Sequence, residues 1–201
     1  AKLDRLQKAQ VLSQPDRLGR VQGDYNSRFR EGDTYDFVTR DGLTNTVIQR
    51  GTIQVRLRGE DEYEGVSTSG NVPGGRGNRA GFVLSDGGGT YDPPWVLIPA
   101  GEFQAGKKME GRAIRTNASG QRYWIDYETR VLGREKIQTA FGEIDSWKVE
   151  TRFLTENGGR SLLTFWYDQD WGYAVKYILE VRIGGAPDIR IREMVARRRT
   201  N

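Results

Sequence analysis

QRYWIDYETRVLG, residues 121–133, alternates apolar and polar side chains along most of its length. Successive side chains of an extended strand point to opposite faces, whereas a helix repeats its apolar residues every three or four positions. The side chains that share one face are Tyr123, Ile125, Tyr127, Thr129 and Val131. The stretch therefore predicts an antiparallel strand that buries one face and leaves the other in water.

The same alternation occurs on either side of this stretch, at residues 52–58, 147–153 and 175–183. Turn-forming sequences separate these segments at intervals typical of hairpins. They are DG (41–42), NASG (117–120), ENGG (156–159) and GGAPD (184–188). We therefore predict an all-β fold of antiparallel hairpins. Segments 71–81 and 85–94 are so rich in Gly and Pro that we expect long mobile loops there rather than central strands.

The start of the chain follows a different pattern. Leu3, Leu6 and Val11 lie near helical spacing and Pro15 ends the pattern, so we predict one short amphipathic helix. A short helix needs packing to be stable, so it either lies across the sheet of its own chain or docks on a neighbouring subunit.

We divide the chain into residues 1–30, a helix and linker, residues 31–105, a first β-unit, and residues 106–201, a second β-unit with a basic C-terminal tail. The two β-units also suit one continuous domain. A repeat between Gly32–Val55 and Gly106–Val131 favours duplication, because each segment runs from a glycine through a strand, a glycine-containing turn and a second strand.

The chain contains no histidine and no cysteine. These absences remove the usual metal ligands, the common general base near neutral pH and the Ser-His and Cys-His nucleophile pairs. Carboxylate pairs remain, Asp126 with Glu128 and Asp168 with Asp170, but carboxylates on a strand face usually pair with arginines on the neighbouring strand. We therefore expect a protein that is not an enzyme and that holds no metal or cofactor.

Charge is distributed unevenly, with a net +4 over residues 1–30, −5 over residues 31–105 and +5 over residues 106–201. Of the basic residues, 24 are Arg and seven are Lys. Arginine binds carboxylates and phosphates by two-point contacts, although a solvated strand face produces the same alternation. The candidate ligand-binding or partner-binding residues are Leu3, Leu6, Arg76, Arg79, Trp95, Trp171, Arg197, Arg198 and Arg199.

Four phrases occur together in this chain: GDTYDF (32–37), YDPPWVLIPAGEFQAGKKMEG (91–111), LGREKIQTAFGEIDSWKVE (132–150) and TFWYDQDWGYAVKY (164–177). In this combination the chain resembles a broad group of exported proteins of Gram-negative bacteria, mostly of unknown function. The resemblance implies a location in the periplasm or at the outer membrane. It also implies a curved antiparallel sheet, a β-roll or half-barrel similar to periplasmic lipoprotein carriers, and no activity. The chain departs from the group at Met109, where a tryptophan is expected.

The aromatic residues of these phrases are predicted to form the core. Trp147 follows the turn at Phe141, and Trp166 and Tyr167 lie on the next strand within reach of it across a hairpin. The predicted core residues are Ile125, Tyr127, Trp147, Val149, Trp166 and Tyr167.

These observations favour a non-enzymatic envelope protein that docks on a larger periplasmic or surface assembly or self-associates. Two alternatives stay open: a carrier that holds a lipid or another apolar ligand, and a glycan-binding or glycan-cleaving module at Asp168 and Asp170. Nucleic acid is disfavoured, because the run Arg197–Arg199 occurs without an RNA-binding motif or an aromatic platform at a recognised spacing. No apolar run reaches the roughly 18 to 20 residues of a transmembrane helix, and the start at Ala1 rather than Met favours a processed chain.

Overall fold

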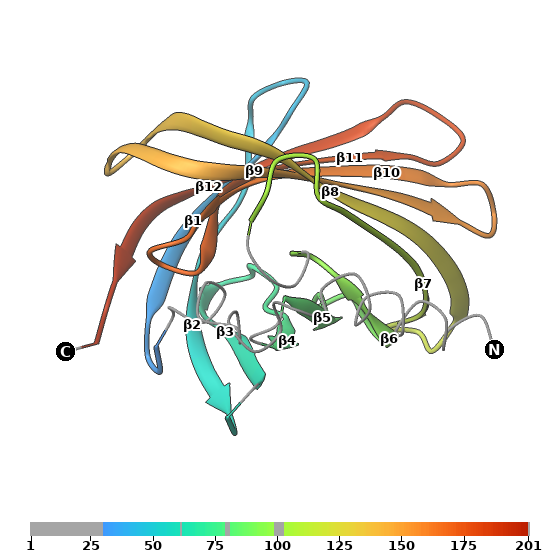
Figure 1. Ribbon diagram of the computed structural model, residues 1–201, viewed down its shortest axis with the longest axis horizontal. Helices are drawn as coiled ribbons and strands as arrows, with labels where there is room; N and C mark the ends of the chain where they lie inside the picture. Colours follow the sequence, from blue (N-terminus) through green and yellow to red (C-terminus); the bar gives the residue numbers. More distant parts are fainter. Residues whose placement is uncertain (1–29, 61, 79–80, 99–102, 201) are drawn as a thin grey trace.

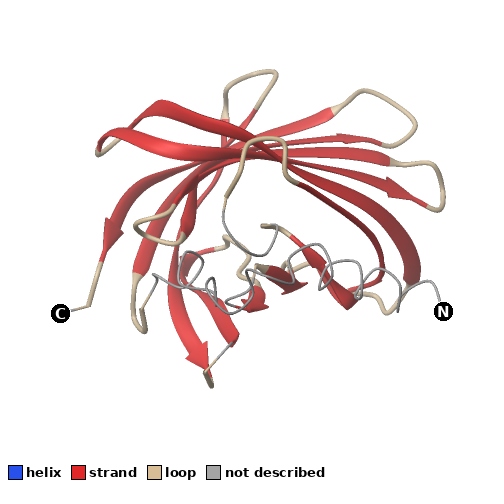
Figure 2. Ribbon diagram, in the orientation of Figure 1, coloured by secondary structure: helices blue, strands red, loops and turns tan. Residues whose placement is uncertain are grey.

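The computed structural model describes residues 30–60, 62–78, 81–98 and 103–200. Every element of secondary structure in these ranges is a strand (Figure 2), which confirms the predicted all-β class. The strands are β1 (Thr34–Asp41), β2 (Val47–Arg58), β3 (Glu62–Gly70), β4 (Arg76–Asn78), β5 (Phe82–Ser85), β6 (Gly89–Val96), β7 (Lys108–Asn117), β8 (Arg122–Thr139), β9 (Gly142–Thr155), β10 (Arg160–Asp168), β11 (Tyr173–Arg182) and β12 (Asp188–Arg198). The predicted N-terminal helix, with Leu3 and Leu6, lies outside the described residues. No helix that could cross a membrane occurs in the described ranges.

The strands follow one another in sequence order around a closed antiparallel barrel (Figure 1). Closure occurs where the first strand meets the last, because Thr34 of β1 lies opposite both Gln54 of β2 and Arg198 of β12. The prediction of an open β-roll or half-barrel is therefore wrong. An open sheet would leave unpaired N–H and C=O groups along β1 and β12, and pairing the two strands satisfies both edges.

The four predicted turns lie between consecutive strands. The β1–β2 turn shows why: the carboxylate of Asp41 accepts hydrogen bonds from the backbone N–H groups of Leu43 and Thr44, at 2.9 and 2.8 Å. Aspartate at the first position of a turn satisfies backbone donors that have no strand partner. Local turn chemistry therefore fixes the hairpin positions.

The Gly-rich segments are not only loops, and the expectation of long loops without strands there is wrong. Residues 71–81 contain β4, and residues 85–94 contain most of β6. Gly89 shows how glycine serves a strand here: a Cβ atom at this position would lie 2.6 Å from the Thr116 carbonyl oxygen. The absence of a side chain lets β6 approach β7 closely.

The two segments of the predicted repeat begin in the same way. Gly32 donates its N–H to the Val55 carbonyl at 2.9 Å, and Gly106 donates to the Val131 carbonyl at 2.7 Å. In both cases the valine N–H bonds back to the residue after the glycine, at 2.8 Å. Both glycines have φ near +80°, a conformation that costs other residues energy, which explains why glycine stands at the start of each segment.

Buried side chains form three clusters. Trp147 stacks on Phe103 with 5.1 Å between ring centroids and lies opposite Tyr167 across β9 and β10. Trp166 lies opposite Lys148 and belongs to another cluster. The structure buries Ile125, Tyr127, Val149, Trp166 and Tyr167, and it buries Trp147 in part.

Candidate functional site

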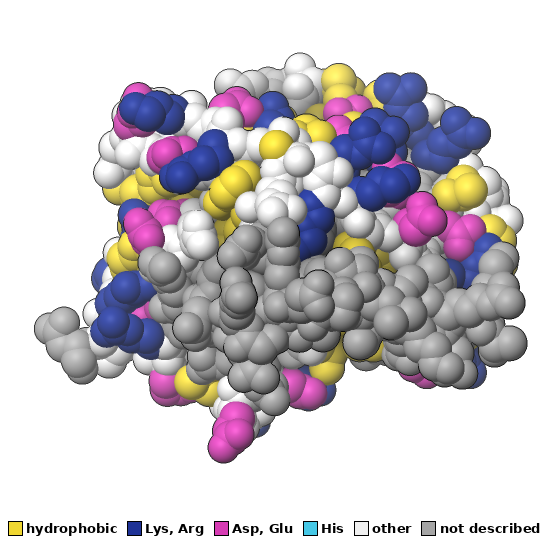
Figure 3. Space-filling model, viewed as in Figure 1, with side chains coloured by type: hydrophobic (Ala, Val, Ile, Leu, Met, Phe, Trp, Pro, Cys, Tyr) yellow, Lys and Arg dark blue, Asp and Glu magenta, His cyan; other side chains and the backbone are white. Residues whose placement is uncertain are grey.

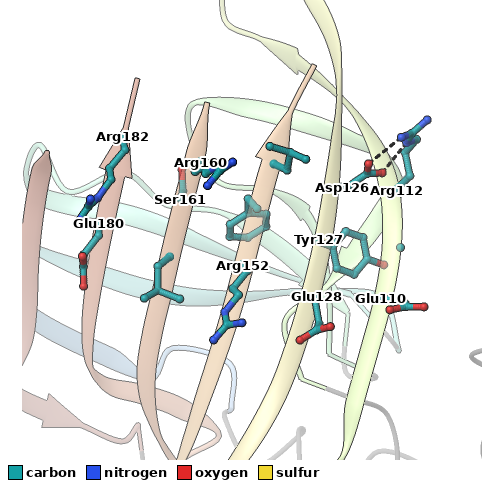
Figure 4. Close-up of a pocket in the computed structure, with 14 residues that line it drawn as sticks. Glu110, Arg112, Asp126, Tyr127, Glu128, Arg152, Arg160, Ser161, Glu180 and Arg182 are labelled. Atoms are coloured by element: carbon teal, nitrogen blue, oxygen red, sulfur yellow. Dashed lines mark hydrogen bonds and ion pairs between the residues drawn. The ribbon is translucent and has the colours of Figure 1, made fainter. Parts of the chain in front are cut away.

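A groove of about 810 Å³ lies on the face of the sheet formed by β7 to β11 (Figure 4). Strand alternation places these side chains on the outward face, because their neighbours in sequence, such as Ile125 and Ala113, are buried. Residues that line the groove include Glu110, Arg112, Asp126, Glu128, Arg152, Leu154, Arg160, Leu162, Glu180 and Arg182.

The strand register brings the lining together in two rows that cross all five strands. In the first row, Arg112, Asp126, Leu154, Arg160 and Arg182 lie opposite one another in succession. The second row, two residues along each strand, consists of Glu110, Glu128, Arg152, Leu162 and Glu180. Side chains far apart in sequence thus become direct neighbours.

Two leucines contribute apolar surface to the groove on the outward face. Leu154 of β9 is 40% exposed, and Leu162 of β10 lies diagonally across from it. Diagonal neighbours on one sheet face lie within reach of long side chains. An exposed apolar surface with a charged surround is typical of sites that bind a partner.

On the β7–β8 side the charges are paired within the protein. Arg112 donates two hydrogen bonds to the carboxylate of Asp126, at 2.6 and 2.7 Å, and its guanidinium lies 4.2 Å from the Trp124 ring centroid. This two-point geometry is the strongest form of a surface ion pair. The pair therefore forms a fixed wall of the groove.

Glu128 is held ionised in the same way. Lys108 Nζ donates to Glu128 at 3.2 Å, and Arg130 approaches its other oxygen at 3.2 Å. The hydrogen bond from Lys108 holds the pKa of Glu128 below its usual value. A general acid needs a raised pKa, so this carboxylate suits a structural ion pair better than acid catalysis.

On the β10–β11 side the charges are not paired. Arg160 lies directly opposite Arg182, and Glu180 lies beside them in the second row. No hydrogen bond or ion pair joins any of these three side chains to another part of the described chain. Like charges directly opposite each other destabilise a sheet, so this arrangement is unfavourable unless an acidic group binds it.

The predicted binding residues lie elsewhere. Trp95 is only 5% exposed and packs edge-on against Phe153, with 5.0 Å between centroids. Arg76 of β4 pairs with Glu62 at 2.8 Å. Leu3, Leu6 and Arg79 lie outside the described residues. Their proposed roles stay predictions.

The structure brings the C-terminal arginines and Trp171 together. The guanidinium groups of Arg197 and Arg199 lie 4.4 and 4.3 Å from the Trp171 ring centroid. Arg197 also pairs with the buried Asp168, and Arg198 pairs with Asp36 at 2.9 Å. These arginines connect the last strand to the rest of the barrel.

The carboxylates of the DQD sequence form a turn. Asp168 Oδ1 accepts a hydrogen bond from the Asp170 N–H at 2.8 Å, and Asp168 is 5% exposed. Across the described residues, no group of three or more acidic side chains is placed to hold a metal ion.

Of the groove residues, Asp126 and Glu128 were singled out in the sequence as a carboxylate pair. The leucines, Arg160 and Arg182 were missed, although two signals pointed to the leucines. Phe153–Leu154 and Leu162–Leu163 each place two apolar residues in succession, which makes both faces of a strand apolar at that point. They flank one hairpin turn, 156–159, so the two outward leucines had to lie close together. That Arg160 lies opposite Arg182 can be predicted only from the register of β10 and β11, and no local sequence pattern gives this register.

Comparison with known proteins supplies a family and a fold. The sequence profile of a family described as "Protein of unknown function (DUF3108)" matches residues 86–187, just over half of the chain. A candidate lipoprotein from Parabacteroides distasonis has a similar structure, with TM-score 0.50, 13% identity and coverage of 85% of this chain and 98% of that one. A candidate exported protein with a YmcC-like fold from Bacteroides fragilis has TM-score 0.51, 11% identity and coverage of 85% and 97%. No curated protein matches the chain.

These similarities confirm, at the level of fold, the predicted resemblance to exported β-rich proteins of Gram-negative bacteria. The family match covers β7 to β11, the strands that form the groove, together with β6.

Proposed function

Since the chain belongs to the DUF3108 family of proteins of unknown function, we propose a function from its own groove: a non-enzymatic binding protein of the cell envelope that docks another envelope protein on the β7–β11 face. The envelope location is supported by the descriptions of the similar structures as a candidate lipoprotein and a candidate exported protein.

The observation that carries the proposal is the set of unpaired charges beside exposed leucines. Arg160 and Arg182 lie opposite each other and neither forms an ion pair with another described residue, and Leu154 exposes apolar surface next to Arg160. A partner that brings a carboxylate and an apolar side chain would relieve the repulsion and bury the leucine in one step.

A protein surface suits this groove better than an anionic lipid. Glu180 on β11 and Glu110 on β7 lie in the same groove, and these carboxylates repel a purely anionic headgroup. A protein presents charges of both signs at fixed spacing, which complements such a mixed surface. Figure 3 shows acidic and basic side chains interspersed over the upper part of the visible face of the molecule.

The carrier and glycan alternatives stay predictions. A lipid carrier needs an apolar cavity, and the groove on the β7–β11 face is lined mostly by charged side chains. A glycan hydrolase at Asp168 and Asp170 needs two carboxyl groups that can reach a sugar, whereas Asp168 is 5% exposed and is paired with Arg197.

The test uses a photo-crosslinking amino acid placed at Leu154 in protein expressed in a Gram-negative envelope. The control places it at Leu132, which is exposed to nearly the same extent, 42% against 40%, and does not line the groove. We expect a crosslinked protein partner from position 154 alone, with loss of the crosslink when Arg160 and Arg182 are both changed to Glu. The partner is then purified, and its affinity for wild type and for this double variant is measured by calorimetry. Equal crosslinking from both positions, or crosslinking to lipid alone, would contradict the proposal.

A further inference from the structure

The ladder between β6 and β7 covers only part of β7. Its register runs from Gly89–Asn117 to Asp92–Ile114, although β7 continues back to Lys108. Figure 1 shows β6 and β7 meeting at the lower right of the barrel and separating toward the segment that precedes β7. Among the described residues, the ladder on the β6 side therefore ends before Arg112 and Glu110, whereas the ladder with β8 continues to Lys108.

Two features of β6 explain why it leaves β7. Pro94 occupies the position that would next face β7, opposite Arg112, and proline has no N–H to donate. Two residues further on, the carbonyl of Val96 accepts a hydrogen bond from the Thr129 hydroxyl at 2.7 Å. Thr129 is fully buried, so this bond holds the end of β6 beneath β8, inside the barrel.

The hairpin that joins β7 to β8 shows which backbone groups of β7 are left. Asn117 donates its N–H to the Gln121 carbonyl, so Asn117 faces β8. Because successive residues of an antiparallel strand face opposite sides and β7 contains no bulge, Gly111 also faces β8 while Glu110 and Arg112 face away from it. Within the described ranges, no residue pairs with the outward N–H and C=O groups of Glu110 and Arg112.

This free edge is accessible and borders the groove. Glu110 is exposed, and Glu110, Gly111 and Arg112 all line the groove on its β7 side. Unpaired edges are a risk for aggregation, and charged side chains such as Lys108 are a usual protection. The same charges also restrict which strands can pair here.

We propose that the edge of β7 at Lys108–Arg112 accepts an extended segment of the partner protein as an additional strand. This inference rests on the proposed docking function and specifies how the partner binds. Strand addition supplies backbone hydrogen bonds for affinity, and alternate side chains supply specificity. Side chains on the groove face of β7 read basic, acidic, basic at Lys108, Glu110 and Arg112. The complementary segment carries an acidic, a basic and an acidic residue at every second position.

A second copy of this chain is a poorer occupant. Antiparallel pairing of two β7 edges centred on Glu110 would place Glu110 opposite its own copy and Lys108 opposite Arg112. Like charges directly opposite each other are destabilising, so this register is disfavoured. The pattern needs a different sequence on the added strand.

The probe is a synthetic peptide, Thr-Asp-Val-Lys-Val-Asp-Thr, whose charge pattern reads the same in both directions and so fits either strand polarity. Its control carries the reversed charges, Thr-Lys-Val-Asp-Val-Lys-Thr. We expect the control to bind at least about tenfold more weakly, because every cross-strand pair becomes repulsive.

The variant Glu110→Pro removes the outward N–H without removing a bond to β8, because proline is tolerated on the open side of an edge strand. Glu110→Ala is the matched control, since it removes the same charge and keeps the N–H. We expect Glu110→Pro to lose peptide binding by about tenfold relative to Glu110→Ala. Equal affinity of the two variants would overturn the proposal.

Amide hydrogen exchange of the wild-type protein provides a measurement that needs no variant. We expect fast exchange at Glu110 and Arg112, slow exchange at Gly111, and slowing at both fast sites when the peptide binds. Strong protection of Glu110 and Arg112 in the free protein would refute the free edge. If the Arg160 and Arg182 double variant loses partner binding and Glu110→Pro keeps it, strand addition is rejected and the docking function is kept. If Glu110→Pro loses partner binding and the double variant keeps it, only the contact with Arg160 and Arg182 is rejected.

Discussion

Replacing Thr129 with valine tests how the end of β6 is held inside the barrel. Valine has nearly the same shape as threonine but has no hydroxyl, so the change removes the 2.7 Å bond to the Val96 carbonyl and the 2.9 Å contact with the Thr151 hydroxyl. Thr129 and Thr151 are both fully buried, so water cannot replace the lost partners.

The magnitude follows from the groups that lose a partner. A buried polar group without a hydrogen bond costs about 1 to 3 kcal/mol. Two such groups, partly offset by the better burial of a methyl group, give an expected loss of about 2 to 4 kcal/mol. With a urea m-value near the upper end of the usual range, about 3 kcal/mol per molar, the midpoint falls by about 1 M.

The assay is urea unfolding followed by tryptophan fluorescence. Thr129→Ser is the control, because it keeps the hydroxyl and loses one methyl group, which costs about 1 kcal/mol. If Thr129→Val is as stable as Thr129→Ser, the hydroxyl does not anchor β6, and the explanation for the free edge of β7 loses one of its two causes.

Three further perturbations follow from the structure. Asp168→Ala leaves Arg197 without its carboxylate in a nearly buried site, and we expect the free energy of unfolding to fall by about 3 to 5 kcal/mol. The control is the double variant Asp168→Leu with Arg197→Met, which removes both charges. If Asp168→Ala loses no more stability than this double variant, the ion pair itself is unimportant. The lowered pKa of Glu128 adds stability that is present above its unfolded pKa and is lost as pH falls through its folded pKa. We therefore expect Lys108→Ala to flatten the acid limb of the curve of unfolding free energy against pH. An unchanged acid limb would count against the Lys108–Glu128 pair. Trp147→Ala should cost about 3 kcal/mol or more by opening a cavity beside Phe103, and unchanged thermal unfolding would remove Trp147 from the core.

Local patterns were enough to predict the strands. The alternation around Ile125 and Tyr127 needs only an extended backbone, and the turn at Asp41 needs only its own carboxylate and two nearby N–H groups. Such signals lie within a few residues of one another, so the sequence displays them directly.

Closure of the barrel could not be predicted in the same way. Thr34 and Arg198 meet across the whole length of the described chain, and nothing near either residue signals the other. The Gly-rich segments were misjudged for a related reason: glycine weakens an isolated strand, but at Gly89 it permits an approach to Thr116 that only the assembled sheet reveals.

The groove depends on register, which is also a property of the sheet. Arg160 and Arg182 each look like an ordinary exposed arginine until β10 and β11 are aligned. The apolar pairs Phe153–Leu154 and Leu162–Leu163 are visible in the sequence, but only the structure shows that Phe153 and Leu163 pack against the core and that Leu154 and Leu162 lie on the other face. In each pair, burial of one residue accounts for one apolar side chain and leaves the exposed leucine unexplained.

The lengths of the ladders around the barrel decide how it comes apart. β4 pairs with β5 through two residue pairs, Arg76–Ser85 and Gly77–Val83, whereas β8 and β9 stay paired from Ile125–Thr155 to Thr139–Gly142. A ring needs only one break to become an open sheet, and the break occurs first where the fewest bonds hold it. We therefore expect local unfolding to separate β4 from β5 first, while the ladder between β8 and β9 stays intact. On the timescale of this local opening, the molecule alternates between a closed barrel and an open curved sheet.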